Sequence, residues 1–204
     1  MELSLCMVLD VVNGTITTDL KEFRIKAKND IYMETMIKAL ARVSSQYITR
    51  DSSYHLERTF MCEFYHQWSM LLQMENPKGL YLNGEVCKHL YDNNNEKCKY
   101  PDLILYHSQD DNQDNRIACE LKRQNWDDKD FAKDMKSLKL VLTSASNNAK
   151  LKSNFKWGVF IQIGGSIDRI EAFVNNKRYQ KDIWCIVVND DVTEITIKTI
   201  GDMK

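Results

Sequence analysis

The most informative part of the sequence is the segment Tyr100-Pro101-Asp102-Leu103-Ile104-Leu105, together with the segment Glu120-Leu121-Lys122-Arg123 that follows 14 residues later. An Asp- and Asn-rich run at 110–115 lies between them and is typical of a turn. The apolar residues on either side favour strands at 102–107 and 116–122, joined as an antiparallel hairpin. Asp102 and Glu120 are equidistant from residue 111. A hairpin centred there places their two carboxylates side by side.

The second strand of this hairpin is expected to gather polar groups on one face. Side chains alternate between the faces of a strand, so Glu120 and Lys122 share one face, while Cys119 and Leu121 pack inward against a helix. Two carboxylates about 4 Å apart repel by roughly 4 kcal/mol at an effective dielectric constant of ~20, unless a proton or a cation lies between them. Oxygen ligands favour Mg²⁺ or Mn²⁺ over zinc.

A Glu-x-Lys strand end also occurs in ordinary proteins as a solvent-facing ion pair, so the surrounding elements decide its meaning. The periodicity predicts an N-terminal strand and helix at 5–12 and 30–45, and a long helix at 54–73. It then predicts a strand at 79–87, the hairpin, a helix at 128–143, and a strand, a helix and a strand at 155–163, 166–176 and 183–189. We therefore expect an α/β protein with a mixed sheet flanked by helices on both faces.

This order resembles the PD-(D/E)XK nuclease superfamily, which has a restriction-endonuclease-like fold with an α-β-β-β-α-β core. The resemblance is carried by Pro101-Asp102 and by Glu120-Leu121-Lys122, and covers about residues 54–190. It implies that Asp102, Glu120 and the backbone carbonyl of Leu121 bind Mg²⁺ or Mn²⁺, and that Lys122 is catalytic. It also divides the chain into an N-terminal extension, 1–50, packed on a nuclease-like domain, 51–204.

Many enzymes of this superfamily carry one more acid on the helix before the sheet. On the helix at 54–73, Glu57 falls in the middle of the apolar face, where a carboxylate is costly without a partner. The alternative is that Glu57 only complements the helix dipole and faces solvent. The Glu57-Arg58 pair also resembles the start of this helix in some bacterial members, which favours Glu57 as a further metal ligand and catalytic residue. Glu63 lies at the margin of the same face and is the second candidate.

Candidate substrate contacts follow the motif. Arg123, Gln124 and Asn125 stand where related enzymes place polar residues near the scissile phosphate, and Lys150 and Lys152 lie in a segment that is expected to be a loop able to reach a phosphate. The other basic and aromatic residues of this region have simpler interpretations as a solvated helix face (Lys129, Lys133, Lys136) and as core (Trp126, Trp157, Trp184).

The charge distribution is compatible with a nucleic-acid substrate although the net charge is only −1. Residues 1–121 hold 13 basic and 18 acidic side chains (−5), residues 122–156 hold nine and four (+5), and residues 157–204 hold six and seven (−1). The basic excess begins at Lys122. We therefore expect a localised patch and a bound cation rather than a broadly basic surface.

Six irregularly spaced cysteines, the absence of a secretory signal pattern and the absence of a run of about 20 apolar residues lead us to expect reduced thiols in the cytoplasm and no membrane segment. The sequence thus predicts a metal-dependent nuclease acting on nucleic acid, with DNA the expected substrate. A homo-oligomer or a partner protein could add specificity. The alternatives are a catalytically silent nuclease-like module for binding or assembly, and an unrelated α/β domain in which Asp102 and Glu120 lie far apart.

Overall fold

The structure of the protein is a computed structural model that describes residues 6–49, 56–75, 80–84, 88–92, 95–99, 101–107, 115–143, 155–174 and 181–203. The described helices are α1 (Lys21–Lys26), α2 (Ile31–Arg42), α3 (Gln46–Thr49), α4 (Leu56–Glu75), α5 (Asp128–Thr143) and α6 (Asp168–Val174), with a 3₁₀ helix at Ile200–Asp202. The described strands are β1 (Met7–Val12), β2 (Thr15–Ile16), β3 (Tyr81–Gly84), β4 (Lys88–Asp92), β5 (Asn95–Lys99), β6 (Leu103–Tyr106), β7 (Ile117–Arg123), β8 (Trp157–Ile163), β9 (Trp184–Val188) and β10 (Glu194–Thr199).

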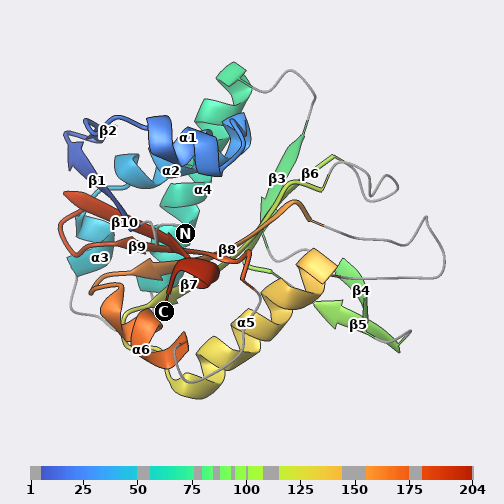
Figure 1. Ribbon diagram of the computed structural model, residues 1–204. Coiled ribbons are helices and arrows are strands. Elements are labelled where there is room, and N and C mark those ends of the chain that lie inside the picture. The colour runs from blue at the N-terminus through green and yellow to red at the C-terminus, as the bar shows by residue number, and fades with distance from the viewer. Residues whose placement is uncertain are drawn as a thin grey trace.

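An eight-stranded sheet forms the centre of the molecule, in the order β2-β1-β10-β9-β8-β7-β6-β3 (Figure 1). Strands β7, β8 and β9 are parallel and the remaining pairs are antiparallel. Strands β4 and β5 form a separate two-stranded ribbon. The predicted α/β class with a mixed sheet is confirmed.

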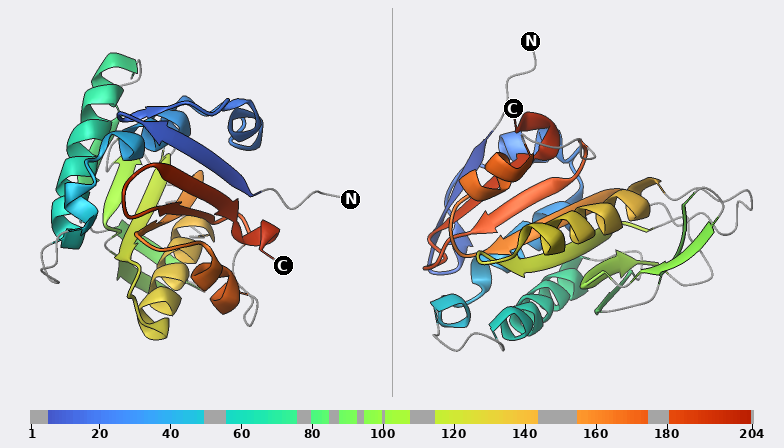
Figure 2. Two further views of the ribbon diagram at one scale, coloured as in Figure 1. Left: turned by 90° about the vertical axis from the view of Figure 1, so that its left-hand side faces the viewer. Right: turned by 90° about the horizontal axis from the view of Figure 1, so that it is seen from below.

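Helices cover both faces of the sheet, which gives three layers (Figure 2). One apolar cluster joins α1, α2 and α4 to the sheet through residues such as Phe23, Met36 and Phe64. A second cluster, on the other face, joins α5 and α6 to the sheet through Phe131 and Ile170. The helices flank the sheet on both faces, as the sequence predicts.

Strand β7 runs between these two clusters. Its alternate residues Ile117, Cys119 and Leu121 belong to the cluster of α2 and α4, whereas Ala118 belongs to the cluster of α5 and α6. The polar face of β7 therefore does not face solvent along its length, because α5 covers it. This arrangement buries Glu120, which is only 6% exposed.

Several predicted elements have nearly the predicted bounds, and others were missed. Helix α5 spans the predicted 128–143, and the predicted strands and helices at 155–163, 166–176 and 183–189 appear as β8, α6 and β9. The strand predicted at 79–87 is β3 in its described part, and the β4-β5 ribbon that follows it was not predicted. Strand β10, which joins β9 to β1, was also missed.

Asp30 fixes the start of α2 and ties it to β8. Its Oδ1 accepts hydrogen bonds from the backbone N–H groups of Tyr32 (3.0 Å) and Met33 (3.4 Å), and its Oδ2 accepts from Lys156 Nζ (2.5 Å) and Trp157 Nε1 (3.0 Å). Burial raises the pKa of Asp30, but the bonds from Lys156 and Trp157 outweigh it and leave the pKa below its usual value.

Two further findings concern the thiols and the helices. Cys6, Cys62, Cys119 and Cys185 are free thiols. Within the described ranges, no helix has both the length and the apolar character needed to cross a bilayer.

Candidate active site

The β6-β7 hairpin brings the two motif acids together. Leu103 pairs with Cys119, and Leu105 pairs with Ile117. This register is centred on residue 111, as predicted, and places Asp102 opposite Glu120 one step beyond the last pair. Asp102 Oδ2 accepts a hydrogen bond of 2.7 Å from the backbone N–H of Leu121. The turn itself, at 108–114, lies outside the described residues.

Glu120 is a buried acid whose ionised form is disfavoured. Burial, followed by the neighbouring carboxylates of Asp102 and Asp134, raises the pKa of Glu120 to about 8. A hydrogen bond with Ser137 and the charge of Lys122 oppose this shift and do not cancel it. At neutral pH Glu120 is therefore largely protonated when no cation is bound beside it.

Lys122 lies at the end of β7 between two carboxylates. Its Nζ is 3.5 Å from Asp134 Oδ2 and 3.6 Å from Glu57 Oε1. Burial lowers the pKa of Lys122, but Asp134, Asp102, Glu57 and Glu120 together raise it above its ordinary value. The ammonium is thus charged at any pH at which the protein would be assayed.

Glu57 reaches this site from the first turn of α4, on the opposite face of the sheet from α5. In addition to its contact with Lys122, its Oε2 accepts a hydrogen bond of 3.3 Å from the backbone N–H of Arg123. The second candidate, Glu63, accepts instead from Gln67 Nε2 at 2.7 Å, further along the same helix. Of the two candidate helix acids, Glu57 is therefore the one that contacts the motif.

Asp134 is a fifth member of the cluster that the sequence analysis did not select. It lies on α5, is 5% exposed, and its buried Oδ2 makes no hydrogen bond of ordinary geometry to the described residues. Burial raises the pKa of Asp134 to about 6, although Lys122 opposes the shift. The sequence does contain a signal that Asp134 is buried, because it falls within the apolar stripe formed by Phe131, Met135 and Leu138.

The predicted substrate contacts lie around the end of β7. Arg123 is partly exposed, and Gln124 and Asn125 are exposed in the following turn. The side chain of Gln124 packs on Gly164 and Gly165 at the end of β8. This turn is fixed by Arg169, whose guanidinium donates to the carbonyls of Gln124 and Trp126. The predicted contacts Lys150 and Lys152 lie outside the described residues.

The site offers hard oxygen donors that suit a divalent cation. Asp102 and Glu120 are neighbours, and a cation between them would relieve the repulsion that, together with the larger effect of burial, raises the pKa of Glu120. Among the described residues, no three His, Cys, Asp or Glu side chains are grouped so as to hold a metal by themselves. The predicted ligands are Asp102, Glu120, the backbone carbonyl of Leu121 and Glu57, but Glu57 contacts Lys122 and the backbone N–H of Arg123. Its role as a metal ligand therefore stays a prediction. These donors are compatible with Mg²⁺ or Mn²⁺.

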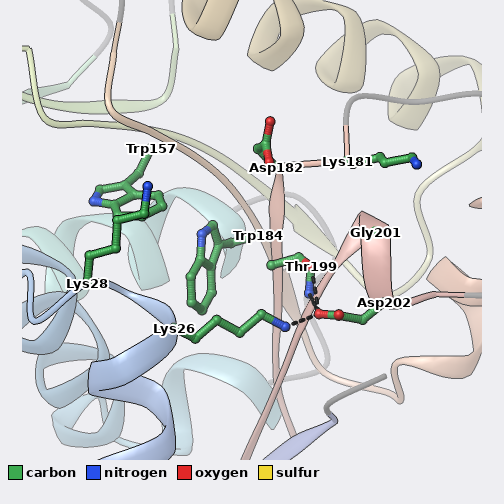
Figure 3. Close-up of a pocket in the computed structure, with 9 residues that line it drawn as sticks. All are labelled: Lys26, Lys28, Trp157, Lys181, Asp182, Trp184, Thr199, Gly201 and Asp202. Carbon is green, nitrogen blue, oxygen red and sulfur yellow. Dashed lines mark hydrogen bonds and ion pairs between the residues drawn. The ribbon is translucent and has the colours of Figure 1, made fainter. Parts of the chain in front are cut away.

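A cavity of about 370 Å³ lies elsewhere on the molecule (Figure 3). Its lining includes Trp157 and Trp184, which begin β8 and β9, whereas the motif lies at the opposite end of β7. Lys26 forms an ion pair with Asp202 at its margin, as Figure 3 shows. Both tryptophans are 8% exposed or less and belong to the core, as expected. None of the motif residues lines this cavity.

Comparisons with protein-family models, with curated proteins and with solved structures found no match to this chain. Its function is therefore inferred from the fold and from the side chains gathered at the end of β7.

Proposed function

We propose that the protein is a metal-dependent nuclease of the PD-(D/E)XK type, with a restriction-endonuclease-like core, that hydrolyses phosphodiester bonds of nucleic acid, and that DNA is its expected substrate. The observation that carries the proposal is the convergence of Asp102, Glu120 and Lys122 at one end of the β6-β7 hairpin. An unrelated α/β domain with a chance motif would have no reason to bring these residues together.

Each residue has a distinct proposed role. Asp102, Glu120 and the carbonyl of Leu121 would hold Mg²⁺ or Mn²⁺, and the cation, when bound, would supply Lewis acidity at the scissile phosphate. Lys122 would donate hydrogen bonds to the attacking water or to a phosphate oxygen. Glu57 would hold the end of β7 in place through the backbone of Arg123.

The charge of the site supports phosphate chemistry only when a cation is present. Four acidic side chains surround one ammonium, from Glu57, Asp102, Glu120 and Asp134, although the pKa of about 8 leaves Glu120 largely protonated at neutral pH. Such a site repels a phosphate group until positive charge is added. This requirement fits an enzyme whose activity depends on a divalent cation.

The test is cleavage by the purified protein of plasmid, linear duplex, single-stranded DNA and RNA, with Mg²⁺ or Mn²⁺ and with EDTA. We expect cleavage with metal and its loss with EDTA. Asp102→Ala and Lys122→Ala should each lower the rate by roughly 10²-fold or more, the size expected when a group that stabilises the transition state is removed. Lys133→Ala, on the exposed side of α5, is the matched control. Equal cleavage by wild type and both variants would indicate a contaminating nuclease and refute the proposal.

A catalytically silent binding or assembly module is the second candidate. It is favoured by one observation, namely that Lys122 already has two carboxylate partners within the protein. Such a module would lack both metal binding and cleavage. Proximity of the two motif acids weighs against it, because a module that binds no cation gains nothing from the repulsion between them.

A further inference from the structure

Asp134 occupies a position that an acid would not be expected to hold for stability. It faces the sheet from α5 among apolar neighbours and is 5% exposed. Burying a carboxylate is costly unless it is paired, and Asp134 lies near Asp102 and Glu120, which add repulsion. A residue that destabilises its own surroundings suggests a role in function.

The contact that offsets this cost is with Lys122. Asp134 Oδ2 lies 3.5 Å from Lys122 Nζ, and Glu57 Oε1 lies 3.6 Å from the same atom. The two acids come from α5 and α4, which pack on opposite faces of the sheet, so the ammonium is held between them. A lysine side chain is flexible, and two fixed anions restrict where its end can lie.

These two contacts differ in rigidity. The Glu57 side chain is 40% exposed and also accepts a bond from the backbone of Arg123, whereas the Asp134 side chain is 6% exposed and packed in the middle of α5. The distances from Lys122 Nζ to Glu57 and to Asp134 both exceed those of ordinary hydrogen bonds. The ammonium can therefore still donate a hydrogen bond to a further acceptor.

We propose that Asp134 is a positioning residue that aims the Lys122 ammonium at the scissile phosphate. This inference rests on the proposed nuclease function and deepens it. Asp134 acts through Lys122 and does not bind the cation. Its removal should therefore affect turnover rather than the binding of metal or nucleic acid.

The experiment compares wild type with Asp134→Asn, which keeps the side-chain shape and removes the charge. Asp130→Asn, an exposed acid one turn earlier on α5, is the matched control. We expect Asp134→Asn to lower kcat by roughly tenfold to a hundredfold, as expected for a misaligned catalytic group. KM and the Mn²⁺ affinity measured by calorimetry should stay within about twofold of wild type, and the control should be unchanged, because the charge that it removes lies in solvent.

A second measurement does not depend on activity. Thermal unfolding of Lys122→Met, Asp134→Asn and the double variant forms a cycle, and pairing predicts that the two effects are not additive. If Asp134→Asn does not fold, Asp134→Ser takes its place.

Three results would overturn the inference. The first is a loss of Mn²⁺ affinity in Asp134→Asn, which would make Asp134 a ligand. The second is an unchanged kcat in an active protein, and the third is additive effects on unfolding. Failure of the nuclease proposal gives a different result from all three, because the wild type itself would then cleave no nucleic acid with any metal. That result would also refute the positioning role of Asp134.

Discussion

Replacing Glu120 with glutamine should stabilise the metal-free protein as the pH rises. The pKa of this buried carboxyl is raised from 4.5 to about 8. A pKa that is higher in the folded state gives a contribution to stability that is complete below pH 4.5 and is lost as the pH rises to 8. At 1.36 kcal/mol per unit, the loss reaches roughly 5 kcal/mol at high pH. A glutamine side chain at this position cannot ionise and avoids this loss.

The assay is chemical denaturation of both proteins in EDTA at pH 5 and pH 8. The free energy of unfolding of Glu120→Gln relative to that of wild type should increase by about 3 kcal/mol between pH 5 and pH 8. The reason is that the folded wild type holds a proton on Glu120 that the unfolded chain has released. Glu22→Gln, an exposed acid on α1, is the control and should show no such change. Saturating Mn²⁺ should reverse the order by stabilising only the wild type. Parallel stability curves for wild type and variant would refute this account of Glu120.

Three further predictions concern Glu57 at the site, Asp30 at the start of α2 and Gly164 at the end of β8. Glu57→Gln should lower kcat by roughly tenfold through the loosening of Lys122, whereas Glu63→Gln should leave the cleavage rate unchanged. Asp30→Ala should lower the free energy of unfolding by about 2 kcal/mol, because it removes the N-cap of α2 and the ion pair with Lys156. Since the pKa of Asp30 is lowered in the folded state, its contribution should be present above pH 3.8 and lost below it, and an acid titration followed by circular dichroism would show the loss. Gly164→Ala should cost about 1–2 kcal/mol in thermal unfolding, because φ is +81° there and the new Cβ would lie 2.6 Å from a carboxylate oxygen, and equal stability would contradict this.

The local patterns of the sequence were sufficient to predict the hairpin and the elements that follow it. The apolar stripe of α5 and the Asp/Asn-rich run at 110–115 are short-range signals, and a hairpin centred on residue 111 predicts the register that places Asp102 beside Glu120. The pairing of β1 with β10, next to the edge strand β2, was not predicted. Met7 pairs with Ile197, and no local pattern indicates that residues so far apart in sequence are neighbours.

The sequence patterns also did not predict that Glu120 is buried. Alternation along β7 correctly placed Glu120 and Lys122 on one face, but it could not indicate that α5 lies over that face and buries Glu120. For the same reason Asp134 was missed. The test that singled out Glu57, an acid inside an apolar helix face, applies equally to α5 and would have identified it.

The proposed function requires that the end of the β6-β7 hairpin bind a divalent cation. Calorimetric titration of the metal-free protein with Mn²⁺ tests it most directly, with Asp102→Asn and Glu63→Gln compared under the same conditions. We predict one bound ion in the wild type and in Glu63→Gln, and an affinity at least roughly tenfold lower in Asp102→Asn, because a carboxylate ligand has been removed. Absence of binding to the wild type at millimolar Mn²⁺, or equal affinity in all three proteins, would contradict the claim.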